Sequence, residues 1–243
     1  MNEPWTRVEQ PVGFAVPDWQ PPPHPGPPRL AGSYCRIEPL EASRHSDALF
    51  QSWQSSEECK ARWVYLGGCP FDDLPGCRKW LAHQAANDDP AFMAIIDAAS
   101  HQATGTAAYL NIVAEHGTIE LGHLSFSSRL ARTPAATEAL YLLMRHAFAL
   151  GYRRLEWKCD ALNVPSRRAA ERLGFSFEGI FHQHRVVQGH NRDSAWFALL
   201  DHQWPRLVPC FRQWLAPENF DAGGRQHTAL STLTAAALQR EEA

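Results

Sequence analysis

The segment NVPSRRAAERLGF, residues 163–175, has the features of a short helix with a defined beginning and end. Pro165 suits the first turn of a helix, where a missing N–H costs nothing. Asn163 and Ser166 are both candidates for the capping residue or a first-turn acceptor. Gly174 is typical of the left-handed residue that follows a helix. The segment therefore predicts one compact helix.

Basic residues stand at the start of this helix. Arg167 and Arg168 lie in its first turns, where positive charge opposes the helix dipole. Stability alone does not favour that placement. It raises the question of whether an anion binds there.

The composition is that of an ordinary globular protein. The chain has 243 residues, of which 44% are hydrophobic and 20% charged, and its formal net charge is −3. A negative net charge gives no global field for nucleic acid, so no nucleic-acid partner is expected. No apolar run is long enough to cross a membrane, and the N-terminus does not resemble a secretory signal. We therefore expect a cytoplasmic protein with no membrane partner.

Six cysteines are scattered along the chain without a CxxC pair. In a chain of this length without a secretory signal, they are predicted to be reduced thiols. No disulfide framework is expected.

The first part of the core predicts an antiparallel meander with two helices. Short apolar or alternating runs separated by short turns favour strands joined by hairpins, and apolar residues at helical spacing favour the helices. The predicted strands cover residues 34–40, 91–97, 103–113 and 117–127, and the helices fall within 41–55 and 75–88.

Farther along the chain the hydrophobic period changes. A long apolar helix over residues 134–152 is followed by a strand over 153–161, the helix of 163–175, and two more strands within 176–201. This order predicts a βαβα unit with a right-handed crossover. Together with the meander it predicts an α+β fold, a mixed and mainly antiparallel β-sheet flanked by helices.

Three regions are predicted along the chain. Half of the 18 prolines fall in the first 28 residues, so residues 1–32 form an extended Pro-rich arm or strap. Residues 33–204 form the folded domain. Residues 205–243 form a helical extension whose apolar positions make a homodimer plausible.

The order of elements and two motifs resemble the GNAT superfamily of acyl-CoA-dependent N-acetyltransferases. The motifs are ARTPAATEA, residues 131–139, and NVPSRRAAERLGFSFEG, residues 163–179. Within that superfamily the sequence is most similar to the branch that includes the ribosomal-protein alanine N-acetyltransferases. The resemblance covers roughly residues 33–201. It implies acetyl-CoA as co-substrate, and an acceptor that is an amine-bearing small molecule or a protein N-terminus.

The resemblance implies a phosphate-binding loop before the long helix. A helix N-terminus offers free N–H groups and a positive dipole end, which suit a pyrophosphate. The family's loop falls on residues 131–136, with Ala131 in place of a polar residue and Pro134 in place of a glycine, so one phosphate contact is lost. The implied cofactor-binding residues here are Arg132, Thr133, Ala135, Ala136 and Thr137.

The resemblance also gives roles to the opening segment. The family's asparagine bonds the pantetheine arm where two strands splay, which implies Asn163. Its serine lies near the sulfur and protonates the departing thiolate, which implies Ser166. Arg167 and Arg168 are then placed to meet phosphates of CoA. The alternative is that Ser166 only caps the helix and the arginines are solvated.

The general base is left open between two residues. Direct attack needs an uncharged amine, and a backbone N–H of the strand carrying LGHLSF holds the developing oxyanion. Glu120 and His123 lie on that strand, on opposite faces if it is regular, although the bulge typical of the family changes that count. A glutamate that related enzymes carry later in the chain is replaced here by Arg185. Asp193 is expected to orient the last two strands.

His182 and His184 share a strand, but groove-lining histidines are a better interpretation than a metal site, and no metal is expected. Trp63 and Tyr65 are expected in the core rather than on the acceptor side. The altered phosphate loop and the missing glutamate leave open an acyl-CoA-binding sensor or interaction module without transfer activity.

Overall fold

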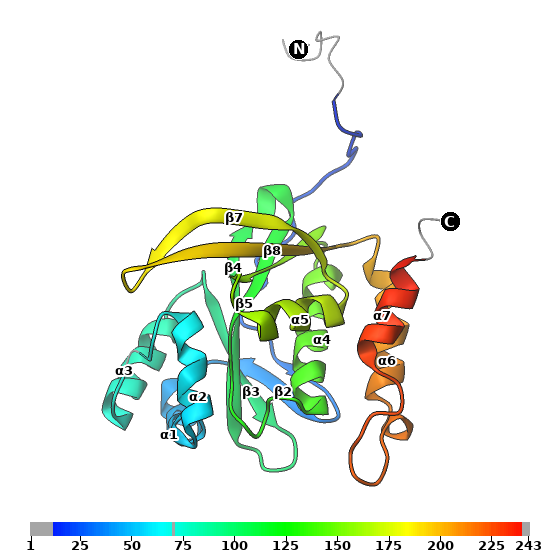
Figure 1. Cartoon of the computed structure of the whole chain (residues 1–243). Helices are drawn as coiled ribbons and strands as arrows, with labels where there is room; N and C mark the ends of the chain where they lie inside the picture. The colour runs from blue at the N-terminus through cyan, green and yellow to red at the C-terminus, as the bar shows by residue number, and fades with distance from the viewer. Residues whose placement is uncertain (1–11, 70, 240–243) are drawn as a thin grey trace.

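The computed structural model describes residues 12–69 and 71–239. Eight strands form one sheet in the order β1-β2-β3-β4-β5-β6-β8-β7 (Figure 1). All neighbours are antiparallel except β5 and β6, which are parallel. The predicted α+β fold with a mixed, mainly antiparallel sheet is confirmed. The strands are β1 Leu30–Ala31, β2 Cys35–Pro39, β3 Ala91–Asp97, β4 Ala103–Val113, β5 Thr118–Phe126, β6 Arg154–Asp160, β7 Ser176–Val187 and β8 His190–Leu200.

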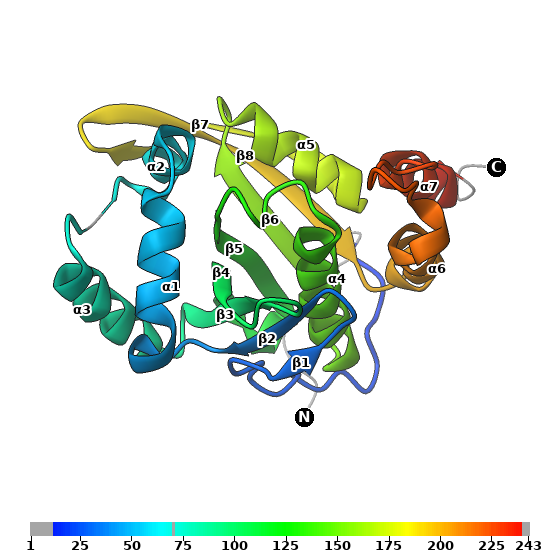
Figure 2. The same ribbon diagram turned by 90° about the horizontal axis from the view of Figure 1, so that it is seen from below.

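Helices cover both faces of the sheet. Figure 2 shows α1, α2 and α3 on one side and α4 to α7 on the other. The helices are α1 Ala42–Gln54, α2 Glu57–Ala61, α3 Leu74–Ala85, α4 Pro134–Ala149, α5 Val164–Leu173, α6 Trp204–Leu215 and α7 Leu230–Gln239, with 3₁₀ turns η2 Arg62–Leu66, η3 Ala114–His116 and η4 Pro217–Asn219.

Each face has its own hydrophobic core. Ile119 and Leu155 project from β5 and β6 toward α4. Phe92, on β3, projects the other way, against Leu49 and Trp53 of α1. The sheet is therefore buried on both sides, which explains why its middle strands are apolar at consecutive positions.

The predicted βαβα unit is present as β5-α4-β6-α5. Helix α4 ends three residues before the predicted residue 152, because Gly151 adopts φ 98° and turns the chain into β6. Helix α5 begins at Val164, with Pro165 in its first turn, and ends at Gly174, with φ 94°. Both features were predicted from the sequence.

The Pro-rich segment is attached along the domain. Tyr152 donates a hydrogen bond to the carbonyl of Pro23, and the Trp19 indole donates to the carbonyl of Glu115. Leu30–Ala31, inside the predicted arm, already pairs with β2. Residues 1–11 of the predicted arm lie outside the described residues.

The C-terminal helices pack on the α4 side. The rings of Tyr141 in α4 and Phe211 in α6 stack at 5.1 Å. Thr234 of α7 donates to the carbonyl of Arg172 in α5. Residues 240–243 of the predicted extension lie outside the described residues. Among the described helices, none has the length and apolar character needed to cross a membrane.

Candidate active site

The sheet opens between its two parallel strands. β5 and β6 pair at three positions, the last of which joins Glu120 to Glu156. Beyond that pair β5 continues to Phe126 and β6 to Asp160, and no further pairing joins them within the described residues. The stretch between the two strands beyond Glu120 and Glu156 is called the opening below.

A β-bulge in β5 lies at the edge of this opening. Gly122 pairs with Ala108 and Ser125 with Thr106, so His123 and one further residue oppose a single residue of β4. His123 has φ 48°, and its ring lies 5.1 Å from that of Phe92. The bulge therefore turns His123 to the α1–α3 face.

This geometry corrects the expectation from a regular strand. Phe92 belongs to the α1–α3 core, and Glu120 pairs beside Leu110 on that same face. Glu120 and His123 consequently share one face instead of lying on opposite faces. The bulge is the physical reason.

Glu120 is the counter-ion of a buried lysine. Its Oε2 accepts hydrogen bonds from Lys158 Nζ at 2.9 Å and from Asn111 Nδ2 at 2.6 Å. The side chains of Glu120 and Lys158 are only 4% and 7% exposed. These two donors commit the carboxylate to the fold, because removing it would leave the lysine buried without a partner. His123 is thus the better candidate base.

The pKa of His123 is lowered from its ordinary value. Desolvation by the surrounding protein is the largest cause, and the positive charges of Arg185, Arg192 and Lys158 add to it. The residue is nonetheless exposed, so the ring is reachable from the surface bordered by β5, β6 and the β7–β8 hairpin on the α1–α3 side, which is called the groove below. At neutral pH the imidazole is therefore uncharged and able to accept a proton.

The start of α4 is capped by its own threonine. Thr133 Oγ1 accepts from the Ala136 N–H at 3.3 Å and donates to the Leu130 carbonyl at 2.7 Å. Pro134 has no N–H. In this turn the Ala135 N–H has no hydrogen-bond partner within residues 12–69 and 71–239. One free amide at a helix N-terminus is a favourable place for an anion.

The structure separates the two remaining residues of the predicted loop. Arg132 adopts φ 65° just before the helix, and its side chain is 88% exposed, 3.7 Å from Glu58. Thr137 is buried instead, and its Oγ1 accepts from Arg172 at 3.1 Å. Thr137 therefore joins α4 to α5, and its hydroxyl is already engaged.

Asn163 and Ser166 meet at the start of α5. Asn163 is the N-cap, because its Oδ1 accepts from the Ser166 N–H at 3.2 Å. Ser166 Oγ accepts from the indole N–H of Trp157 in β6 at 3.0 Å. The serine is thus not the cap, and its hydroxyl faces the strand that borders the opening.

The two arginines of α5 lie in different surroundings. Arg167 donates to the Ala161 carbonyl at 3.3 Å and lies over the ring of Phe177 at 5.6 Å. Arg168 is exposed. Of the two basic residues at the start of the helix, Arg167 is therefore engaged within the fold and Arg168 is available at the surface.

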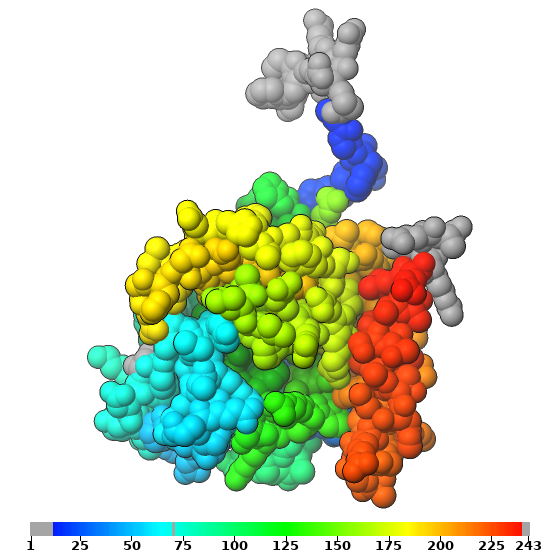
Figure 3. Space-filling model, in the orientation of Figure 1, coloured from blue at the N-terminus to red at the C-terminus, as the bar shows by residue number. Residues whose placement is uncertain are grey.

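The segment after α2 bridges the groove on the α1–α3 side. Gln188, at the tip of the β7–β8 hairpin, donates to the Gly67 carbonyl at 2.8 Å. The Tyr65 hydroxyl donates to the Leu162 carbonyl at 3.4 Å. Figure 3 shows the yellow hairpin meeting the cyan α2 region and α5 on this surface. Trp63 is buried in the core, as predicted, whereas Tyr65 is exposed.

Asp193 joins the last two strands, as the sequence analysis expected. Its carboxylate accepts from Asn191 Nδ2 and from the Gln183 N–H, and it contacts His182 Nδ1 at 2.9 Å. These contacts, with Asn191 the largest, lower the pKa of Asp193 to about 2. In the described part of the chain, no group of three or more His, Cys, Asp or Glu side chains is arranged to hold a metal ion.

Sequence reasoning did not single out Lys158 or Arg192. The alternation that turns Trp157 and Cys159 toward the core turns Lys158 to the opposite face, and this signal was available in the sequence. The pairing of Lys158 with Glu120 could not be predicted in this way, because it depends on the parallel register of β5 and β6.

The chain is similar to known proteins in sequence and in structure. Residues 35–176 match the acetyltransferase (GNAT) domain family. A GCN5-related N-acetyltransferase from Brucella melitensis is 44% identical with a TM-score of 0.87, over 90% of this chain and 100% of that one. The N-acetyltransferase p20 of Bacillus licheniformis is 27% identical over 165 residues, 65% of this chain and 89% of its own length.

A more distant structure shares the fold. An acetyl transferase of Salmonella typhimurium that modifies the N-terminal serine of a 50S ribosomal subunit protein superposes with a TM-score of 0.59 at 19% identity, over 70% of this chain and 96% of that one. The chain described here belongs to the GNAT acetyltransferase family, an acetyltransferase family that uses acetyl-CoA. The family resemblance is confirmed, and the alternative without transfer activity is set aside.

Proposed function

We propose that this enzyme transfers the acetyl group of acetyl-CoA to a primary amine, on a small molecule or a protein N-terminus. The observation that carries the proposal is the opening between β5 and β6, which links two helix N-termini on one face to His123 on the other. When bound, acetyl-CoA supplies an acetyl group activated as a thioester. The six cysteines form no disulfide within the described residues and are largely buried, which fits a reducing compartment and supports a cytoplasmic location.

Residues at the start of α4 fit the phosphates of the cofactor. The free Ala135 N–H and the helix dipole favour a negative charge there. The small Ala136 side chain and the capping Thr133 leave the backbone approachable, and the exposed Arg132 adds a positive charge. Thr137 contributes through its position in the helix rather than through its hydroxyl.

Residues at the start of α5 fit the arm and the thiol end. Asn163 uses its oxygen as a cap and keeps its amide N–H groups to donate to the pantetheine amides. Ser166 accepts from the Trp157 indole and also interacts with the Cys159 thiol, and its O–H hydrogen is the one that would protonate a thiolate. Exposed Arg168 is available to a phosphate, and Arg167 to a lesser degree.

His123 performs the proton transfer on the acceptor side. Its uncharged imidazole removes a proton from the acceptor's ammonium group, so that the nitrogen can attack. The bulge beside it gives β5 one residue more than β4 at this point, and a backbone amide of such an extra residue suits the stabilisation of a developing negative charge. Glu120 holds Lys158 in place.

The direct test is thiol release from acetyl-CoA across a panel of primary amines and short peptides, with mass spectrometry of the products. We expect acetylated amine and free CoA in equal amounts, and thermal stabilisation of the protein by CoA. Absence of both product and stabilisation would refute the proposal.

Asn163 allows the cofactor site to be tested apart from the fold. Asn163→Ala removes both the cap and the amide donor, whereas Asn163→Ser keeps a capping oxygen. Both variants should weaken acetyl-CoA binding by about 1–2 kcal/mol, but only Asn163→Ala should also lower the melting temperature. Normal acetyl-CoA affinity in Asn163→Ser would show that the residue serves the helix alone.

A further inference from the structure

Two arginines face each other across the β7–β8 hairpin. Arg185 pairs directly with Arg192 in the register of the two strands. Side chains at directly opposed positions project on the same face, and like charges there are destabilising. The repulsion between Arg185 and Arg192 therefore destabilises the fold unless another group offsets their charge.

The described chain does not supply that compensation. Neither guanidinium forms an ion pair or hydrogen bond with any residue in the ranges 12–69 and 71–239. Asp193 is next in sequence to Arg192, but adjacent strand positions project on opposite faces, and its oxygens are taken by Gln183 and other donors. Among the carboxylates on this side of β5 and β6, Glu120 is paired with Lys158 and Glu156 with Arg154, while Asp160 Oδ1 accepts from the Leu162 N–H.

Further hydrogen-bond donors line the same face. Arg192 Nε and the indole nitrogen of Trp196 are buried and have no hydrogen-bond partner in the described structure. Trp196 lies four residues after Arg192 on β8, so both side chains point the same way. Lys158 pairs opposite Trp196 and lies over its ring at 4.6 Å. The groove wall is thus rich in donors and positive charge.

The two groove histidines experience the same cations. Arg185, Arg192 and Lys158 all lower the pKa of His123 and of His184 after the larger effect of desolvation. The cations therefore lie within electrostatic range of the candidate base. Lys158 and Arg192 lie on the α1–α3 face, because the positions that alternate with them on β6 and β8 pack in the core on the α4 side, and Arg185 pairs opposite Arg192.

We infer that the acceptor is an amine that also carries an anionic group, a carboxylate or a phosphate, which Arg185 and Arg192 bind while its nitrogen reaches His123. The inference rests on the proposed function and names the class of its acceptor. Charge-assisted bonds from a guanidinium suit both anions. A ligand of this kind satisfies the buried donors and removes the repulsion between the two arginines.

The test compares acceptors that differ only in the anion. Amino carboxylates of increasing chain length are paired with their amides, aminoalkyl phosphates with the amino alcohols, and peptides with acidic residues near the N-terminus with their amide counterparts. We expect the anionic member of at least one series to have a kcat/KM about ten- to a hundredfold higher. The series in which the anionic member is preferred shows whether the anion is the carboxylate of a small amine, a phosphate or an acidic residue of a peptide.

Variants then assign the preference to residues. Arg192→Gln and Arg185→Gln should each remove most of the preference for the anionic acceptor over its neutral counterpart. The loss should come from a higher KM for the anionic acceptor, while the KM for acetyl-CoA stays unchanged. Arg192→Lys should retain part of that preference. Arg225→Gln, which removes an exposed charge between α6 and α7, should change nothing. Equal rates for the paired acceptors, or an equal loss for both members in Arg192→Gln, would overturn the inference.

A binding measurement separates this inference from the proposed function. The melting temperature is followed with each anionic amine and its neutral counterpart, with and without saturating CoA. A larger shift with the anionic amine, absent in Arg192→Gln, supports the anion site even if no turnover is found. Equal shifts in the wild type contradict it, while acetylation of neutral amines would leave the proposed function intact.

Discussion

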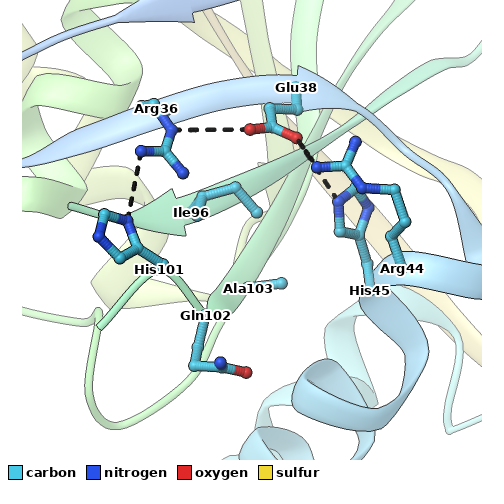
Figure 4. A pocket seen from close by; sticks show the side chains of 8 residues that line it. All are labelled: Arg36, Glu38, Arg44, His45, Ile96, His101, Gln102 and Ala103. Carbon is cyan, nitrogen blue, oxygen red and sulfur yellow. Dashed lines mark hydrogen bonds and ion pairs between the residues drawn. The ribbon is translucent and has the colours of Figure 1, made fainter. Parts of the chain in front are cut away.

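Two basic clusters on this molecule differ in how their charge is balanced. The edge cluster surrounds a hollow of about 280 Å³ beside β2 and α1. In Figure 4 its basic residues lie around one carboxylate, that of Glu38. Arg44 contacts Glu38 at 2.8 Å, Arg36 at 3.6 Å and His45 at 3.9 Å, while His101 bonds Arg36. These charges hold two elements of the fold together.

The groove cluster, Lys158, Arg185 and Arg192, has no such centre. The nearby carboxylates have other partners, since Glu120 is paired with Lys158 and Glu156 with Arg154. The two arginines oppose each other without a partner in the described chain. The comparison teaches that basic residues with a carboxylate among them serve the fold, whereas basic residues without one are available to a ligand.

The largest expected effect is on stability and comes from removing Glu120, the carboxylate that is paired with Lys158. Glu120→Gln leaves Lys158 buried without its counter-ion and should cost about 3–5 kcal/mol of unfolding free energy. Urea denaturation measures it. The double variant Glu120→Leu with Lys158→Met should recover most of the loss, and a loss below about 1 kcal/mol in Glu120→Gln would show that the pair is not structural.

Removal of the base should be next. His123→Gln should lower kcat by about a hundredfold, because a positioned proton acceptor contributes about that much. In the wild type, kcat/KM should have an acid limb below pH 6.5, since the pKa of His123 is lowered from that value and only the uncharged ring accepts a proton. The limb should disappear in His123→Gln. A variant that retains both the rate and the limb would assign the base elsewhere.

The groove cations should affect the pH at which the acid limb of kcat/KM lies. Lys158, Arg185 and Arg192 disfavour the imidazolium, so removing one of them favours the protonated ring and raises the pKa of His123. Arg192→Gln should therefore move the acid limb to higher pH. The pH profile of kcat/KM should be measured with a neutral acceptor, because Arg192 is also proposed to bind the anionic group of a charged one. An unmoved limb would mean that Arg192 is too far from His123 to act on it.

The smallest effect is expected at the edge cluster. Glu38→Gln leaves its arginines in contact with solvent, so the melting temperature should fall by about 2–4 °C or less. The preference between anionic and neutral acceptors should not change. A change in that preference would erase the distinction between the two clusters.

The sequence predicted most of the fold because local signals were strong. Pro165 and Gly174 mark the ends of α5, and the apolar runs mark β3 and β4 to the residue. α2 and η2 were not predicted, since residues 57–66 form short turns stabilised by packing of Trp63 rather than by helical periodicity.

The candidate site was less predictable, because its contacts are long-range. Asn163 and Ser166 could be read from one motif, but the role of Trp157 as donor to Ser166 depends on how α5 packs on β6. The face of His123 depends on a bulge that alternation cannot locate. The opposition of Arg185 and Arg192 depends on a second irregular register, in β7.

Where acetyl-CoA binds is decided most directly by a crystal structure of the full chain with CoA. The pantetheine arm should lie between residues 121–126 of β5 and 157–160 of β6, with its diphosphate at the Ala135 amide. CoA bound at another surface, with this opening filled by side chains, would contradict the mechanism derived from it.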